Sequence, residues 1–185
     1  MMKQEQRWIK KIKKNGSHEA ANELISKYYR EMYAFVYKQT IDSDLSLDLT
    51  QEIFISVLKS IGQFDEKKAS FRTWLYKIAS NRLVDYFRSK NYQYRKLTDS
   101  IEGLDFEGSE DMTISFEYKE DVEQITSIIN ELETSSQQIV RLRLFGEYTL
   151  QEIAEMVQAP LSTVKTRYYA AIKLIKKEMQ VHHHE

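Results

Sequence analysis

The sequence contains no cysteine, which excludes disulfide bonds, zinc–thiolate sites and thiol chemistry. It has one proline and five glycines in 185 residues, fewer than the turns of a β-sandwich or barrel would use. No stretch approaches the roughly 20 consecutive apolar residues of a membrane span. The Lys-rich segment 1–15 lacks the unbroken apolar core of a signal peptide. We therefore expect a cytoplasmic protein that does not insert into membranes.

Signatures of catalysis are missing as well. The chain has no P-loop and no Gly-x-Ser-x-Gly motif, and its carboxylates form no recognisable catalytic pair. His18 is the only histidine outside the run His182–His184 near the C-terminus. Contiguous terminal histidines lack the convergent ligands and supporting contacts of a defined metal site. We predict no enzyme, no cofactor and no metal site.

What the chain does have is segregated charge. The formal net charge is only -1, but residues 1–92 hold 17 Lys and Arg against 11 Asp and Glu, whereas residues 93–120 hold 3 against 8. The middle segment also contains Gly103 and Gly108 and few periodic apolar residues, which is typical of a linker. We predict an all-α protein of two small helical domains, 1–95 and 121–181, joined by an acidic flexible linker, 96–120.

In the first domain, helical spacing of apolar residues runs from Ser17 to about Tyr92, with breaks near 41–46 and 62–70. The helix predicted from about Leu47 to Ile61 has an apolar stripe facing inward, made of Leu49, Ile53, Val57 and Ile61. Its opposite face is polar except for one aliphatic residue, and consists of Asp48, Gln51, Glu52, Ile55 and Lys59.

The strongest local pattern lies in the second domain, between Gly146 and Arg167. Thr149 followed three residues later by Glu152 predicts a capping box at a helix start, and Gln158 to Pro160 predicts a short break before the next helix. Ala154 is small where two crossing helices approach each other. This combination predicts a helix-turn-helix.

The second helix of this motif has a polar outer face. Its apolar residues at helical spacing are Leu161, Val164, Tyr168, Ala171, Ile172 and Ile175. A recognition helix places N-terminal polar residues at base edges in the major groove. We therefore predict DNA contacts from Ser162, Thr163, Lys165, Thr166, Arg167, Tyr169 and Lys173. The alternative is a solvated helix whose basic end complements its dipole.

Residues 59–96 combine aromatic with basic side chains, holding ten Lys or Arg against three Asp or Glu. Such a mixture suits single-stranded DNA, because bases stack on aromatic rings while cations bind phosphates. The alternative is that the rings are core, and the spacing of Trp74, Leu75, Ile78 and Ala79 favours this for Trp74. Lys77, Asn81 and Arg88 share the polar face of the same helix.

Three stretches, Asp48–Phe54, Phe71–Arg88 and the helix-turn-helix, together resemble the extracytoplasmic-function (group IV) sigma factors of the sigma-70 family. The resemblance covers both domains in their order. It implies a sigma factor that binds core RNA polymerase and directs promoter-specific initiation in a stress or envelope response. It also implies three kinds of partner: core polymerase, promoter DNA and an anti-sigma factor.

The resemblance further implies roles for individual residues. Region 2 would dock on the clamp helices of the polymerase beta-prime subunit through Asp48, Gln51, Glu52 and Ile55. The loop from Phe64 to Phe71 would capture a flipped base of the minus-10 element, and Asn81 and its neighbours would help to hold the melted strand. The predicted set is Phe64, Lys67, Lys68, Phe71, Lys77, Asn81 and Arg88. Region 4 would contact the beta flap and read the minus-35 element through Lys165 and Thr166.

The linker has two interpretations, since an acidic chain can occupy the RNA exit channel of the polymerase or serve as a plain tether. Two residues depart from the family pattern: Ala170 replaces a frequent arginine on the recognition helix, and Glu133 replaces a frequent proline before the helix pair. The second departure affects only a helix start. Two other functions stay open, a conventional helix-turn-helix regulator and a sigma-like binding module that has lost promoter melting.

Overall fold

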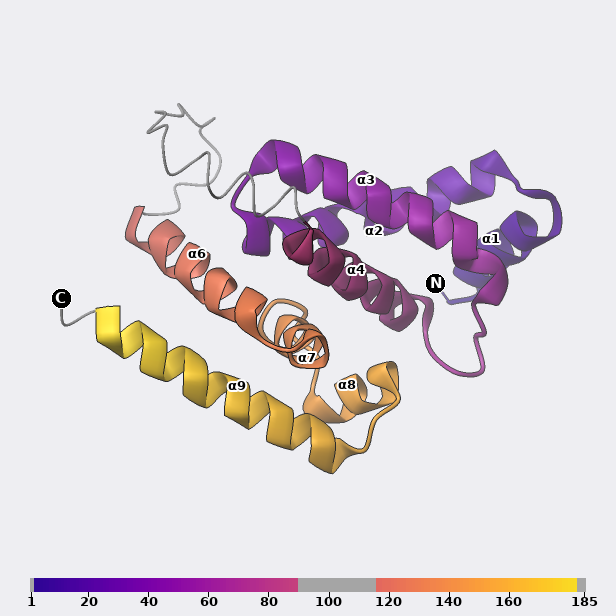
Figure 1. Ribbon diagram of the computed structural model, residues 1–185. Coiled ribbons are helices and arrows are strands. Elements are labelled where there is room, and N and C mark those ends of the chain that lie inside the picture. Colours follow the sequence, from indigo (N-terminus) through magenta and orange to yellow (C-terminus); the bar gives the residue numbers. More distant parts are fainter. Residues whose placement is uncertain (1, 90–115, 183–185) are drawn as a thin grey trace.

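Helices make up all regular structure in the residues described, 2–89 and 116–182, in a computed structural model of the protein (Figure 1). The prediction of an all-α fold is confirmed. Within these two ranges no helix is both long and apolar enough to cross a membrane. The elements in chain order are α1 (Met2–Asn15), α2 (His18–Thr40), α3 (Ser43–Ser60), the short 3₁₀ helix η1 (Ile61–Gln63), α4 (Phe71–Arg88), α6 (Phe116–Glu131), α7 (Thr134–Leu144), α8 (Leu150–Val157) and α9 (Leu161–His182).

Polar residues cap the helices of the first domain where the sequence predicts breaks. The side chain of Ser17 accepts a hydrogen bond from the Ala20 amide at the start of α2, and that of Asp42 does so from Leu45 at the start of α3. Ser70 accepts from the Thr73 amide at the start of α4. Each cap accepts a hydrogen bond from a backbone amide that has no partner within its own helix. Each helix can therefore begin directly after a short connection.

The inward stripe predicted for α3 is confirmed. Leu49, Ile53, Val57 and Ile61 are all 5% exposed or less, and they pack against α2 and α4. The helix begins at Ser43, four residues before the predicted start, because Asp42 provides the cap. The stripe therefore turns the polar side of α3 toward solvent.

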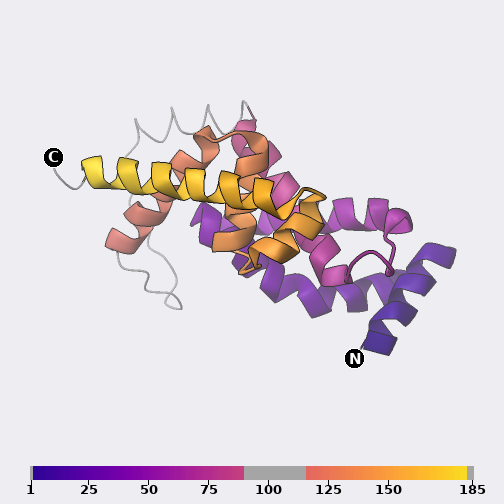
Figure 2. The ribbon, with the colours of Figure 1, turned by 90° about the horizontal axis from the view of Figure 1, so that it is seen from below.

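The second domain consists of α6, α7, α8 and α9 (Figure 2). Its own core contains Ile128, Ile129, Val140, Ala171 and Ile175. Helix α6 begins at Phe116, so residues 116–120, which we expected in the linker, are helical. They follow Gly108, the last glycine of the predicted linker, and contain glutamate and lysine, which favour helices. Glycine and serine content therefore marks the linker better than acidity does. The rest of the predicted linker, residues 96–115, lies outside the described residues.

The two domains pack on each other. Helix α4 lies between α3 on one side and α7 on the other, and α8 contacts α4 as well (Figure 1). A single core of buried residues extends from the first domain into the second, where it includes Ile139, Leu142, Tyr148 and Ile153. The arrangement of the domains, on which the sequence gives no prediction, is therefore compact.

Candidate polymerase and nucleic-acid interfaces

The helix-turn-helix begins with the capping box that the sequence predicts. The Thr149 hydroxyl accepts a hydrogen bond from the Glu152 amide at 3.2 Å, and the Glu152 carboxylate accepts one from the Thr149 amide at 2.8 Å. Hydrogen bonds from the Thr149 side chain and amide lower the pKa of Glu152 below its usual value. Helix α8 is thus fixed at Leu150, directly after the turn that follows α7.

The turn between α8 and α9 is tight because Gln158 takes a left-handed conformation, with φ of 56°. The Ala159 amide then donates to the Ala154 carbonyl at 3.0 Å, which closes the end of α8. Ala154 is buried, as expected for a small residue where the two helices cross. Helix α9 starts at Leu161, immediately after Pro160. The predicted helix-turn-helix is confirmed as a structure.

The outer face of α9 is open to solvent. Val164, Ala171 and Ile175 are buried on its inner side. Of the seven residues predicted to contact the minus-35 element, Thr163 and Arg167 are half-buried, and the exposed ones are Ser162, Lys165, Thr166, Tyr169 and Lys173. Their contact with DNA stays a prediction, but nothing in the described residues covers the face.

Within that face, the Thr166 hydroxyl donates to the Ser162 carbonyl at 2.9 Å. Thr166 therefore presents a hydroxyl acceptor and a methyl group to a bound base. Tyr169 is 61% exposed, the largest exposed fraction among the big hydrophobic side chains described. A tyrosine held out from a basic helix is suited to contact a base edge or the DNA backbone.

The predicted docking surface lies on α3. Asp48, Gln51 and Ile55 are exposed, and Ile55 is 51% exposed although it is aliphatic. Leu47, which the sequence predicted only as a helix start, is 40% exposed on the same helix. Exposed aliphatic side chains among acidic and amide groups are typical of a binding surface.

Glu52, the fourth predicted docking residue, is engaged inside the protein. Arg82 on α4 donates to its Oε2 from Nε at 2.9 Å and also from Nη2. Both side chains are partly exposed. Glu52 therefore links α3 to α4 and presents less of its carboxylate than Asp48 does.

The aromatic residues predicted at the minus-10 loop are buried instead. Phe64 is 6% and Phe71 2% exposed, and their ring centroids lie 5.6 Å apart, with Trp74 within 5.8 Å of both. Neither ring offers a free face to a base in this arrangement, so the alternative that these rings are core describes them better. The physical reason is that both rings belong to the hydrophobic core, where Phe71 also lies 5.4 Å from the ring centroid of Tyr28 on α2.

The polar and basic residues predicted for the same site divide into two groups. Lys67 and Lys68 are exposed on the turn before α4, and Lys77 is half-buried. Asn81 and Arg88 contact the second domain: Asn81 Oδ1 accepts from Gln138 Nε2 at 2.8 Å, and Arg88 Nη1 donates to Thr134 Oγ1 at 2.6 Å. The structure thus places the seven residues along α4 and its preceding loop, without gathering them at one point.

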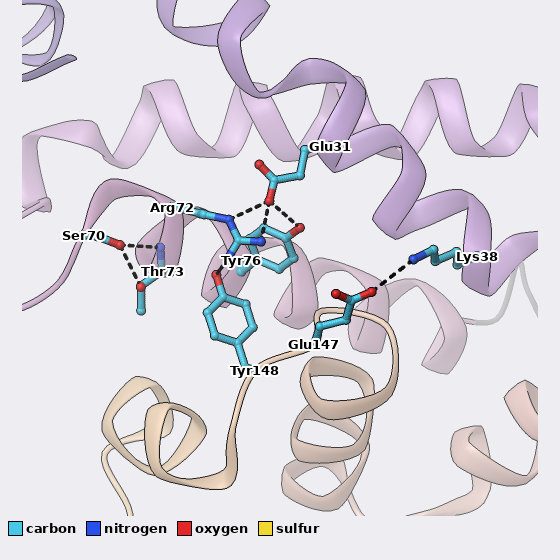
Figure 3. A network of polar contacts seen from close by, with 8 residues as sticks. All are labelled: Glu31, Lys38, Ser70, Arg72, Thr73, Tyr76, Glu147 and Tyr148. Carbon is cyan, nitrogen blue, oxygen red and sulfur yellow. Dashed lines mark hydrogen bonds and ion pairs between the residues drawn. The ribbon is translucent and has the colours of Figure 1, made fainter. Parts of the chain in front are cut away.

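A polar network beside this region was not found from the sequence (Figure 3). Arg72 Nε donates to Glu31 Oε1 at 2.6 Å, and Tyr76 donates to the same oxygen at 3.0 Å. Arg72 Nη1 donates to the Tyr148 hydroxyl at 2.9 Å. Burial raises the pKa of Tyr148 to about 12, with the nearby Arg72 opposing the rise and the Glu31 charge adding to it. No spacing rule joins residues this far apart, so no sequence signal existed.

Within residues 2–89 and 116–182, no group of three His, Cys, Asp or Glu side chains is placed to hold a metal ion.

Comparisons with known proteins agree with the two-domain arrangement. The family model for Sigma-70 region 2 matches residues 24–92, and that for Sigma-70, region 4 matches residues 122–175. The ECF RNA polymerase sigma factor SigW of Bacillus subtilis is 29% identical over 182 residues, covering 93% of this chain and 95% of that protein. SigX of the same organism is 26% identical and covers 85% and 82% respectively.

Two solved structures share the fold. CnrH, in complex with the cytosolic domain of CnrY, superposes with a TM-score of 0.61 at 15% identity and covers 96% of this chain and 98% of that one. The sigma factor RpoE from Bartonella quintana, in complex with the anti-sigma factor NepR, gives 0.55 at 17% identity, with 86% and 96% covered. With regions 2 and 4 both matched in order, this chain belongs to the extracytoplasmic-function group of the sigma-70 family.

Proposed function

We propose that this protein binds core RNA polymerase and directs promoter-specific transcription initiation in the cytoplasm. The observation that carries the proposal is the pairing, in one chain, of an exposed docking face on α3 with an exposed recognition face on α9. A conventional regulator needs the second face but has no use for the first. The domains assigned are 1–95 as region 2, 96–115 as linker and 116–181 as region 4, since α6 begins at Phe116.

Helix α9 reads the minus-35 element in this proposal. Lys165 and Thr166 lie on its first two turns, where a recognition helix meets base edges, and both are exposed. A lysine ammonium group can donate to the O6 and N7 acceptors of guanine, while a threonine methyl can contact the methyl group of thymine. Lys173 and Arg167 are placed to bind phosphates and fix the helix in the groove.

Helix α3 docks on the polymerase through Asp48, Gln51 and Ile55. Ile55 provides an apolar contact of the kind found at the centre of interfaces, and the acidic and amide side chains around it provide hydrogen bonds. Glu52 contributes chiefly by holding α3 against Arg82 on α4. A bulky or charge-reversing substitution on this face is therefore expected to weaken polymerase binding more than it destabilises the fold.

Helix α4 and the loop before it bind the melted minus-10 strand. The basic excess of residues 59–96 supports this role, because phosphate contacts supply most of the affinity for a single strand. With Phe64 and Phe71 buried, the polar and basic set Lys67, Lys68, Lys77, Asn81 and Arg88 carries the contacts.

A protein partner that restrains the factor completes the proposal. Both solved structures that share the fold are complexes, and the partner of RpoE is the anti-sigma factor NepR. We assign this chain an anti-sigma partner on that basis. The acidic linker is assigned to the RNA exit channel of the polymerase, with a plain tether as the simpler alternative.

The experiment that separates this proposal from a conventional regulator compares DNA binding with and without core polymerase. Purified protein is titrated onto a duplex promoter fragment alone, and then as a complex with core enzyme. The proposal predicts weak binding by the protein alone and tight, sequence-specific binding by the complex, because polymerase holds both domains at the spacing of the two elements. Tight specific binding by the protein alone, unchanged by polymerase, would support the regulator instead.

A further inference from the structure

Helix α1 presents basic side chains to solvent. Six of its 14 residues are lysine or arginine, and Glu5 is its one acidic residue. Ile9 and Ile12 are buried in the core of the first domain, and Trp8 packs against the same core. The basic residues of α1 that are exposed are Arg7, Lys10, Lys11, Lys13 and Lys14.

The negative charge of α1 is held against α2. The Glu5 side chain is 15% exposed and forms an ion pair with Lys27. Its carboxylate also accepts a hydrogen bond from the Tyr28 hydroxyl at 2.7 Å. Every exposed charged side chain between Gln4 and Asn15 is therefore positive.

Three of these cations, Arg7, Lys10 and Lys14, lie along one face of α1, because they follow one another at intervals of three and four residues. Lys11 lines a hollow between α1 and α2 together with two glutamates of α2, which offset part of its charge. The helix dipole favours cations only in the last turn, which accounts for Lys14 but not for Arg7 and Lys10. A binding role accounts for all three.

The C-terminal end of α1 is joined to the loop before α4. Lys13 Nζ donates to the carbonyl oxygen of Phe64 and lies 5.5 Å from the centroid of the Phe64 ring. Phe64 begins the loop, residues 64–70, which carries Lys67 and Lys68 and is assigned to the melted minus-10 strand. Both views place α1 and this loop at the same end of the first domain (Figure 1, Figure 2). The basic face of α1 therefore continues the proposed strand-binding surface.

The loop itself has a defined backbone. The Asp65 side chain accepts a hydrogen bond from the Lys67 amide at 3.0 Å, and the Asp65 carbonyl accepts one from the Lys68 amide at 3.0 Å. The Ser70 side chain ends the loop by capping α4. With its other end bonded to α1, the loop holds its two lysines on a fixed turn. A loop that is already ordered loses less conformational entropy when it binds.

Two other partners for a basic helix fit α1 less well. A helix that binds a membrane surface inserts its apolar face into the bilayer, but the apolar face of α1 is already buried on the first domain. An acidic protein surface gives no reason for the bond between α1 and the strand-binding loop. The Sigma-70 region 2 match begins at residue 24, so it assigns no role to α1.

We propose that α1 is a further nucleic-acid contact of this protein, in which Arg7, Lys10 and Lys14 bind phosphates of the melted promoter strand next to the segment held by the loop. Lys13 positions that loop through its bond to the Phe64 carbonyl. This inference rests on the proposed function, because α1 meets the strand only in the complex with polymerase.

The first test locates α1 on the DNA. Because the chain has no cysteine, Gln6→Cys on α1 and Glu66→Cys in the loop can each carry one iron–EDTA group, which cleaves nearby nucleic acid through hydroxyl radicals. Both positions are exposed, and neither belongs to the proposed contacts. In the open complex with polymerase, we expect both groups to cleave the same promoter strand at neighbouring positions. Wild type treated with the same reagent is the control for untethered cleavage.

The outcomes separate this inference from the proposed function. Cleavage from Glu66→Cys without cleavage from Gln6→Cys would overturn the inference and leave the proposed function standing. Cleavage of the RNA transcript alone from Gln6→Cys would overturn it in the same way. If neither variant binds polymerase, the proposed function is wrong, and the inference falls with it.

The second test counts the phosphate contacts. Lys10→Gln/Lys14→Gln removes two cations from α1, and its matched control, Arg30→Gln/Lys38→Gln, removes two exposed cations from α2. Glutamine has nearly the helix propensity of lysine, so the helical circular dichroism should not change. We expect the plot of log affinity of the polymerase complex for promoter against log salt to become less steep by about 1.4 in the first variant only, roughly 0.7 for each contact with a single strand.

Equal salt slopes in Lys10→Gln/Lys14→Gln and its control would overturn the inference. So would a loss of binding to core polymerase by Lys10→Gln/Lys14→Gln with the salt slope of promoter binding unchanged, because the face would then belong to polymerase.

Discussion

Arg82 donates two hydrogen bonds to a single carboxylate oxygen of Glu52, which ties α3, the proposed docking helix, to α4. This ion pair affects how the result of a charge-reversal substitution on α3 can be interpreted. A lysine at position 52 would stand beside Arg82 and repel it, so a loss of polymerase binding there would mix a docking effect with a change in how α3 and α4 pack. Asp48, which is exposed on the same face, gives the cleaner test.

Asp48→Lys is expected to weaken binding to core polymerase at least about tenfold, a change of about 1.4 kcal/mol. The free energy of unfolding should change by less than about 0.5 kcal/mol, because the residue is at the surface. Co-purification with polymerase and urea unfolding measure the two effects. Glu23→Lys, an exposed reversal of the same type on α2, is the control. Full retention of polymerase by Asp48→Lys would show that α3 is not the docking surface.

Lys165→Ala is expected to cost about 1 to 3 kcal/mol of promoter binding and to alter the preferred base at one minus-35 position. The measurement is binding of the polymerase complex to promoters substituted at each position. Lys177→Ala, nearer the C-terminus of α9, serves as the control and should weaken all promoters equally. If Lys165→Ala behaves in that same uniform way, Lys165 contacts a phosphate and does not read a base.

Thr149→Ala is expected to lower the free energy of unfolding by about 1 kcal/mol, since it removes the hydroxyl that caps α8. Urea unfolding at neutral pH measures the loss, with Gln151→Ala in the same helix as the control. Because the pKa of Glu152 is lowered in the folded protein, its part of the capping box is present above the ordinary carboxyl pKa of 4.5 and is lost as the pH falls below it. A loss indistinguishable from that of Gln151→Ala would mean that the box adds no stability.

The raised pKa of Tyr148 predicts a loss of stability in alkali. The unfolded chain releases this proton near pH 10, whereas the folded protein holds it to about 12, so stability falls as the pH rises from 10 toward 12. Burial also raises the pKa of Tyr76, which adds to the same loss. Tyr148→Phe should flatten the decline, measured by urea unfolding at pH 9 to 11, and an unchanged slope would argue that Tyr148 stays hydrated.

Local patterns predicted much of this structure. The inward stripe of α3, the Thr149–Glu152 capping box and the two faces of α9 depend on residues three or four positions apart, a distance at which helical geometry is fixed by the backbone. Glu133, which the resemblance places at a helix start, is the N-cap residue of α7 and makes no side-chain capping hydrogen bond.

Tertiary packing explains what the sequence did not predict. The resemblance implied that Phe64 and Phe71 meet DNA. An aromatic ring in a basic segment suits both a core and a base, and only its neighbours decide between the two. Gln138, Arg141 and Tyr148 meet partners 57, 102 and 76 residues away in Asn81, Gln39 and Arg72. The periodicity of a sequence gives no information on contacts between residues that far apart in the chain.

The most direct test of the central claim is run-off transcription by purified bacterial core polymerase on a library of random promoter fragments, with and without this protein. We predict transcripts that depend on the protein and come from templates sharing one minus-35 and one minus-10 sequence. An identical set of transcripts in both reactions, with no protein bound to polymerase, would contradict the claim that this chain acts as a sigma factor.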